Sequence, residues 1–139
     1  MARVALIKLF TGLNLGVSQL SGELQRAGHD SLIVYFKDFL VVPVEDVHRY
    51  LVTDYAGTLI GARGQETVWN CYKPFSEEEY RLLIGVLEEF DPDLIGFSLT
   101  SLPMHAGAEV TARVKQHFPD VPIIWGGSGP TLEPGLVLG

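Results

Sequence analysis

The chain has 139 residues, 47% of them hydrophobic, which is enough for one globular domain with its own core. The formal net charge is −7 and the ten Lys and Arg residues are scattered, so nucleic acid is not expected as a direct partner. The single cysteine, Cys71, excludes an internal disulfide and any multi-cysteine metal or iron–sulfur site built from this chain alone. The first apolar run is too short for a signal peptide or a membrane span, which predicts a cytoplasmic protein without a membrane partner.

The N-terminal part of the chain predicts a strand, a turn, a helix and a second strand. Apolar residues over 4–10 predict the first strand, and a glycine-containing turn follows over 11–16. Gly28 is a natural end for the helix after this turn, and the run over 31–36 predicts the second strand. The apolar face of the helix recurs at spacings of three and four residues: Val17, Leu20, Leu24 and Ala27.

Residues 37–75 do not follow this alternation of strands and helices. An extended piece ends at 41–43, a short helix fits 45–51, and three glycines interrupt the stretch after it. A segment of this length between a strand and a helix is longer than an ordinary connection. We therefore expect an irregular insert that covers one side of the sheet or the ligand.

A capping box marks the start of the next helix. Ser76 and Glu79 have the spacing at which each side chain bonds the other residue's backbone N–H, and amphipathic sequence follows over 77–90. Asp91-Pro92 ends the helix, because a proline disfavours helical geometry in the residue before it.

The last part of the chain predicts a strand, a helix, a further strand and a glycine pair. Residues 94–97 form a continuous apolar run, typical of a strand buried on both faces, and hydroxyl side chains follow it. Pro103 suits the first turn of a helix that runs to about Phe118. The strand over 122–125 ends in Gly126-Gly127, which either gives a ligand room or permits a tight turn.

This order of elements predicts an α/β fold, a flavodoxin-like or Rossmann-like doubly wound parallel sheet with helices on both faces. The expected strand order is 2-1-3-4-5. In that order the turns at 11–16, 98–102 and 126–131 border one crevice at the carboxyl ends of the strands, where such sheets bind ligands. The sequence stops at Gly139, too soon for a last helix and strand, so we expect both to be truncated and the open edge to permit a dimer.

These turns do not match the common phosphate-binding motifs. The residues after the first strand lack the G-x-G-x-x-G spacing of dinucleotide sites, and no G-x-x-x-x-G-K-[ST] run occurs. The first and third strands do not end in the acidic residues that hold magnesium in a receiver domain. Thr11-Gly12 is a faint match to a flavodoxin-type loop, which leaves FMN as an alternative ligand.

The reactive side chains of the sequence predict no catalytic site. The four histidines form neither an H-x-x-H nor an H-E-x-x-H pattern, and structural roles are expected for all of them: His29, His48, His105 and His117. Cys71 has no His or Asp at a distance typical of an activated nucleophile. The acidic residues at 77–79 favour a helix start. The chain is therefore expected to bind a ligand rather than to catalyse a reaction.

Several segments together resemble a known family. The sequence NLG running into LSGELQRAGHDSLIVYF, followed by DLIGFSLTS and then by PDVPIIWGGSGPTLEP, is similar to the N-terminal cobalamin-binding domain of a class of radical SAM enzymes. The resemblance covers most of the chain and is weakest over 37–75. It implies that cobalamin is the cofactor and that the chain is one domain over 1–139. It also implies a methyltransferase-like parent enzyme whose radical SAM domain, with S-adenosylmethionine and an iron–sulfur cluster, lies beyond Gly139 and contacts this domain.

The resemblance also implies which residues contact the cofactor. Ser98, Thr100 and Ser101 would hydrogen-bond the nucleotide tail of cobalamin, and the glycine pair would give the tail room. The implied cofactor-binding residues are Thr11, Gly12, Leu13, Asn14, Gly16, Ser98, Leu99, Thr100, Ser101, Gly126, Gly127, Ser128, Pro130 and Thr131.

The turn after the first strand departs from one known pattern. Cobalamin modules that coordinate cobalt through the protein carry D-x-H-x-x-G there, with the aspartate orienting the histidine. Aligned on Gly16, this sequence has Leu13 at the histidine position and Thr11 at the aspartate position. We therefore expect no protein nitrogen below the cobalt and an apolar floor instead. An interaction module that has lost cofactor binding is the alternative from another functional class.

Overall fold

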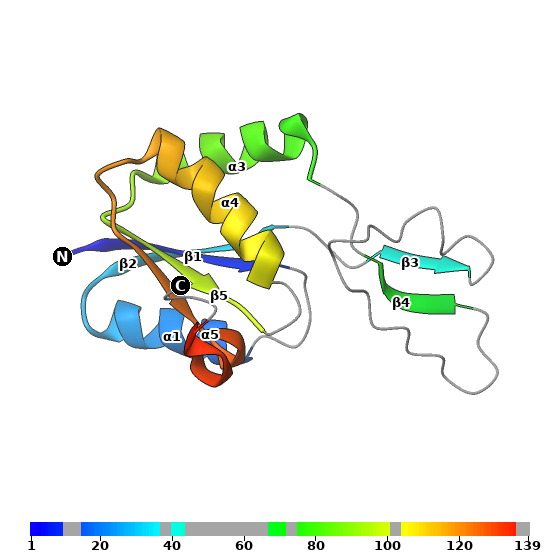
Figure 1. Cartoon of the computed structure of the whole chain (residues 1–139). Coiled ribbons are helices and arrows are strands. Elements are labelled where there is room, and N and C mark those ends of the chain that lie inside the picture. Colours follow the sequence, from blue (N-terminus) through cyan, green and yellow to red (C-terminus); the bar gives the residue numbers. More distant parts are fainter. Residues whose placement is uncertain (10–14, 37–39, 44–66, 72–74, 101–103, 136–139) are drawn as a thin grey trace.

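The computed structural model of the chain describes residues 1–9, 15–36, 40–43, 67–71, 75–100 and 104–135 (Figure 1). In chain order its elements are β1 (Arg3–Leu9), α1 (Leu15–Arg26), β2 (Asp30–Phe36), β3 (Leu40–Pro43), β4 (Thr67–Cys71), α3 (Glu77–Phe90), β5 (Leu94–Ser98), α4 (Met104–His117), β6 (Ile123–Gly126) and α5 (Ser128–Leu132). None of these helices is long and apolar enough to cross a membrane.

Four of the strands form a parallel sheet in the order β2-β1-β5-β6. This confirms the predicted α/β fold with a parallel sheet. No fifth strand of this sheet lies among the described residues, so the order 2-1-3-4-5 and the flavodoxin-like topology stay predictions. In the described part of the chain, β2 and β6 form the edges of the sheet, and the dimer expected at an open edge also stays a prediction.

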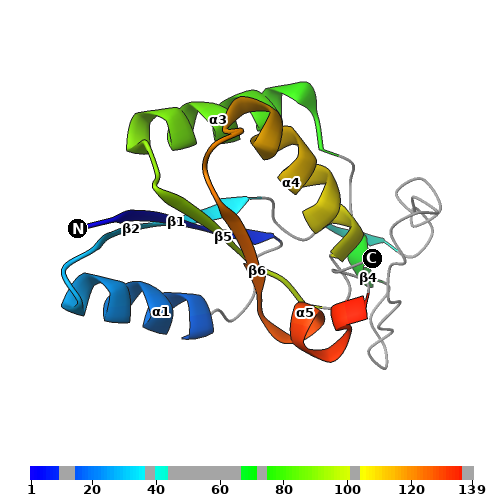
Figure 2. The ribbon, with the colours of Figure 1, turned by 60° about the vertical axis from the view of Figure 1, so that its left-hand side comes forward.

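Each face of the sheet has its own apolar core. Along β1 the odd-numbered residues face the larger core below α3 and α4, and the even-numbered residues Val4 and Leu6 face α1. Figures 1 and 2 show α1 and α5 on one side of the sheet and α3 and α4 on the other. We call the side that carries α1 the α1 face.

The α1 face is only partly covered. Helix α1 packs mainly against β1 and β2. On β6, at the far side of the same face, the Ile124 side chain stays 54% exposed, which is unusual for an isoleucine in a sheet. The α1 face is therefore open to a ligand over β5 and β6.

The start and end of α3 are formed as the sequence predicts. The Glu79 backbone N–H donates to Ser76 Oγ at 3.2 Å, and the Ser76 backbone N–H donates to a Glu79 carboxylate oxygen at 2.6 Å. These bonds satisfy two of the donors that a helix start leaves free. At the other end Asp91 takes a left-handed conformation with φ 50° and donates its N–H to the Leu87 carbonyl.

Replacing Ser76 by alanine is expected to lower the free energy of unfolding by about 1 kcal/mol, because the substitution removes the side-chain half of the capping box. Urea unfolding followed by circular dichroism measures the loss. Ser18→Ala is the matched control, since Ser18 is an exposed residue inside α1 where alanine is at least as good a helix former. Equal losses in the two variants would contradict this role of Ser76.

Two elements differ from the sequence prediction. The insert contains a two-stranded antiparallel sheet of β3 and β4, which Figure 1 shows apart from the four-stranded sheet; only an extended piece at 41–43 was expected there. The helix expected over 45–51 lies outside the described residues. The turn over 126–131 leads into the short helix α5, which tolerates Pro130 because a proline in the first turn of a helix loses no hydrogen bond.

Candidate functional site

A cleft of about 270 Å³ opens on the α1 face at the carboxyl ends of the strands. We call it the α1 cleft. One wall is the first half of α1, the floor is β5, and the other wall is β6 with the residue that follows it. Its lining residues are Leu6, Gly16, Val17, Leu20, Gly96, Phe97, Ser98, Ile124, Gly126 and Gly127. The cleft therefore lies at the sheet edge where the sequence predicts the ligand.

Small residues on neighbouring strands create this hollow. In the strand register Gly96 lies between Leu6 and Ile124, and Ser98 lies next to Gly126. Paired residues of parallel strands point to the same face, so three positions on the α1 face carry little or no side chain. A Cβ atom at Gly126 would meet nothing closer than the Phe97 carbonyl oxygen at 4.0 Å. The space above Gly126 is therefore available to a ligand.

Gly127 has a different reason to be glycine. Its φ is +101°, and a Cβ atom there would lie 2.4 Å from the Leu99 carbonyl oxygen. The turns after β5 and β6 approach each other closely at this point: the Leu99 N–H donates to the Gly126 carbonyl at 2.8 Å, and the Gly129 N–H donates to the Leu99 carbonyl at 3.1 Å. The contact between the turns requires Gly127, whereas the room for a ligand is at Gly126.

Four of the residues that the sequence predicts for the cofactor line the cleft together. They are Gly16, Ser98, Gly126 and Gly127, which come from three different elements or turns. Five others lie outside the described residues: Thr11, Gly12, Leu13, Asn14 and Ser101. Each of the three predicted turns thus contributes at least one described residue to the cleft.

The remaining predicted residues lie outside the lining of the α1 cleft. Leu99 is fully buried on the α4 side, where its side chain packs against Gly107, and both of its backbone polar groups bond the turn after β6. Thr131 donates its hydroxyl to the Gly127 carbonyl at 2.8 Å and so closes the turn of α5. Thr100 and Ser128 are exposed, and Pro130 is half-buried.

The apolar lining of the cleft was missed by the sequence prediction. Of the missed residues, Gly96 is the one that the sequence could have indicated. A lone glycine inside an apolar strand marks a place where a ligand or another backbone approaches closely. Gly96 also precedes Ser98 by two residues and so lies on the same face. The other missed residues are Leu6, Val17, Leu20, Phe97 and Ile124. Their apolar periodicity predicted only core packing.

A buried cation stands beside the α1 cleft. Lys8 pairs with Ser98 in the sheet register and shares the parity of Leu6, so it lies on the α1 face. Its exposed fraction is 8%, and burial lowers the pKa of its ammonium below the ordinary value because desolvation disfavours the charged form. The register thus places a basic side chain next to the cleft, although Lys8 is not among the residues that line it.

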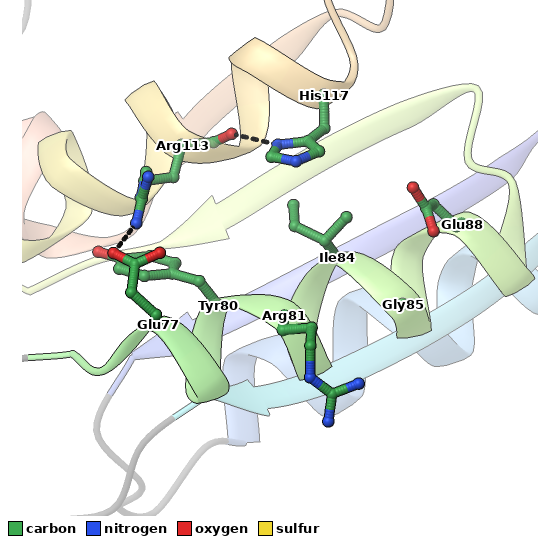
Figure 3. Close-up of a pocket in the computed structure, with 8 residues that line it drawn as sticks. All are labelled: Glu77, Tyr80, Arg81, Ile84, Gly85, Glu88, Arg113 and His117. Atoms are coloured by element: carbon green, nitrogen blue, oxygen red, sulfur yellow. Dashed lines mark hydrogen bonds and ion pairs between the residues drawn. The ribbon is translucent and has the colours of Figure 1, made fainter.

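A second and larger cavity, of about 430 Å³, lies between α3 and α4 (Figure 3). Several of its polar side chains contact one another or a neighbouring residue of the same two helices. Arg113 pairs with Glu77 and lies over the Tyr80 ring at 4.7 Å, and the Tyr80 hydroxyl donates to Glu109 at 2.6 Å. These contacts brace the two helices. We favour the smaller α1 cleft as the ligand site because it lies at the carboxyl ends of the parallel strands, where the strands' turns converge.

The described histidines are placed at helix ends. His29 Nδ1 accepts a bond from the Ala2 N–H at 3.0 Å, His117 Nδ1 lies 3.1 Å from the Arg113 carbonyl, and His105 is exposed in the first turn of α4. None of them lines the α1 cleft. Within the described residues, no group of three or more His, Cys, Asp or Glu could hold a metal ion.

The geometry of the α1 cleft suits a flat, largely apolar group with a few polar contacts. Leu6, Val17, Leu20 and Ile124 supply apolar walls, and Ser98 supplies a hydroxyl. Comparisons with models of protein families, with curated proteins and with solved structures found no match. The volume is slightly below the roughly 300–1,000 Å³ of sites for drug-sized ligands, so one ring system fits rather than a large cofactor as a whole.

Proposed function

We propose that this chain binds cobalamin and holds the nucleotide tail of the cofactor in the α1 cleft. One observation carries the proposal: Gly16, Ser98 and Gly126, which the sequence resemblance implies as contacts of the cofactor, line one cleft on one face of the sheet. These residues are far apart in the sequence. The flavodoxin-like topology with strand order 2-1-3-4-5 is part of the same proposal.

The tail of cobalamin matches the cleft in size and chemistry. Its benzimidazole is a flat, mostly apolar ring system that the side chains of Leu6, Val17 and Ile124 can enclose. The Ser98 hydroxyl can both donate and accept a hydrogen bond at the floor of the cleft. The corrin ring is much larger than the cleft, so the tail is the part that enters it.

We propose further that the protein gives the cobalt no nitrogen ligand from below. None of the described histidines lines the α1 cleft, and the aligned position of the ligand histidine holds Leu13. Bound cobalamin supplies a cobalt atom that can carry and transfer a methyl group. The residues of this chain bind and orient the cofactor, and the methyl transfer belongs to a radical SAM domain with S-adenosylmethionine and an iron–sulfur cluster.

Hydroxocobalamin mixed with the protein is expected to co-elute with it through a desalting column. The visible spectrum should be that of cobalamin whose benzimidazole has left the cobalt, without a protein imidazole in its place. The reason is that the tail occupies the α1 cleft and no described histidine lines it. FMN in a parallel sample tests the flavodoxin-like alternative through its yellow colour.

Two outcomes would count against this function. Loss of all corrinoid on the column at high micromolar protein would reject cobalamin binding by this chain. Retention with histidine-ligated or benzimidazole-ligated cobalt would reject the ligand-free cobalt, and benzimidazole ligation would also place the tail outside the cleft.

A further inference from the structure

Lys8 is a charged residue in a place where charge is costly. It lies near the carboxyl end of β1, the central strand that pairs with both β2 and β5, and only 8% of its surface is exposed. Burying an ammonium without a counterion is unfavourable, so such residues are rare unless they are paired or bind something. Apart from Lys8, every residue of β1 from Val4 to Leu9 is apolar.

No described carboxylate pairs with Lys8. The ion pairs of the described residues involve Arg3, Arg26, Arg81 and Arg113, and none involves Lys8. In the same part of the chain no fully enclosed side-chain nitrogen or oxygen lacks a hydrogen-bond partner. Because the Lys8 ammonium forms no hydrogen bond with another described residue, it keeps a small contact with solvent and stays reachable for a ligand.

The surroundings of Lys8 offer further groups that bind anions. Ser98, its register partner on β5, lies on the same face of the sheet and lines the α1 cleft. Adjacent strands are about 4.8 Å apart, so a long lysine side chain can reach a group bound at Ser98. Helix α1 begins at Leu15, and its first turn, with Gly16 and Val17, lines the same cleft.

The first turn of α1 adds partial positive charge at this end of the cleft. The first backbone N–H groups of a helix have no partner inside the helix, and the helix dipole places partial positive charge there. No acidic residue in the first turn of α1 offsets that charge. The cleft thus has a positive end next to apolar walls.

We infer that the Lys8 ammonium, the Ser98 hydroxyl and the start of α1 form an anion subsite at the carboxyl end of the α1 cleft, and that this subsite takes the phosphate ester of the ligand. A phosphate offers several oxygens in different directions, which suits an ammonium, a hydroxyl and backbone N–H groups that converge from different elements. The apolar walls take the organic group that the phosphate carries. The inference rests on the cleft itself and goes beyond the proposed cofactor, since several phosphate esters share this chemistry; the cobalamin tail is one of them.

Inorganic phosphate is the first probe, and amide chemical shifts in two-dimensional NMR are the readout. In the wild-type protein, phosphate titrated to tens of millimolar is expected to shift the amides of Gly16, Val17 and Ser98 along a saturable curve. In Lys8→Met these shifts are expected to disappear, because methionine keeps an unbranched chain without the charge. Lys115→Met is the matched control: it removes the same charge from α4, on the other side of the sheet, where Lys115 donates to the Val121 carbonyl, and it should titrate as wild type does.

The second probe compares hydroxocobalamin with cobinamide, which lacks the phosphodiester and the nucleotide. Lys8→Met is expected to weaken hydroxocobalamin binding at least tenfold and to leave cobinamide binding within twofold of wild type. Three outcomes would overturn the inference. The wild-type shifts do not saturate, phosphate shifts the amides of wild type and Lys8→Met equally, or the two proteins bind hydroxocobalamin with equal affinity. If phosphate shifts the amides saturably and only when Lys8 is present, but hydroxocobalamin is not retained, the subsite is supported and the cofactor is rejected. A failure of the subsite can therefore be told from a failure of the proposed function.

Discussion

Gly127→Ala is expected to destabilise the domain by about 3 kcal/mol, at the upper end of the cost of a glycine-only backbone conformation. At φ +101° and ψ −176° an alanine is strained by its own backbone. Its Cβ atom would also lie 2.4 Å from the Leu99 carbonyl oxygen, which two hydrogen-bonded turns hold in place. Urea unfolding measures the loss.

The neighbouring residue provides the matched control. Gly126 has no positive φ, and a Cβ atom there would have its nearest neighbour at 4.0 Å. Gly126→Ala is therefore expected to change the free energy of unfolding by less than about 1 kcal/mol, since it also restricts the unfolded chain. Equal losses in the two variants would show that the close contact of the turns does not determine stability here.

Gly126→Leu is expected to weaken hydroxocobalamin binding at least tenfold without unfolding the protein. The leucine side chain would project onto the α1 face beside Ser98 and occupy the space that we assign to the nucleotide tail. The affinity is measured by absorbance titration, and circular dichroism confirms that the variant is folded. The effect is steric, so it does not depend on the charge of Lys8.

Gly85→Leu is the matched control, because it places the same side chain in the cavity between α3 and α4. Gly85 is an exposed residue of α3 that lines the space between α3 and α4, and a Cβ atom there would meet nothing within 4 Å. Leucine is also a better helix former than glycine by roughly 0.5–1 kcal/mol. Hydroxocobalamin affinity is expected to stay within twofold of wild type. If Gly85→Leu weakens binding and Gly126→Leu does not, the cofactor lies between α3 and α4 instead of in the α1 cleft.

Local patterns in the sequence predicted most elements of the four-stranded sheet and its helices. Ser76 and Glu79 marked the start of α3 because a capping box is a contact between residues close in sequence. Helix α5 was missed because its glycines and proline favour a loop, and its bond to the Leu99 carbonyl joins residues that are far apart in the sequence. Strand β4 was missed because its pairing with β3 joins residues far apart in the chain.

The candidate site was predictable as far as the sheet geometry alone determines it. Parallel strands place their carboxyl ends at one edge, so Ser98 and Gly126 were expected to meet, and they do. Which side chains enter the cleft depends on their face of the sheet. Gly96 belongs to the cleft because it shares the parity of Ser98, whereas Leu99 leaves the strand on the other side and packs against Gly107.

The bonds that join Leu99 to residues 126 and 129 tie the end of β5 to the start of α5. A ligand that contacts Ser98 therefore meets a wall whose backbone is already ordered by folding, which lowers the entropy that binding must remove. Any shift of the β5 end on binding also moves α5, because the two share these bonds. A group that binds α5 more tightly in one state of the cleft than in the other would therefore change the affinity of the cleft by the same factor in return.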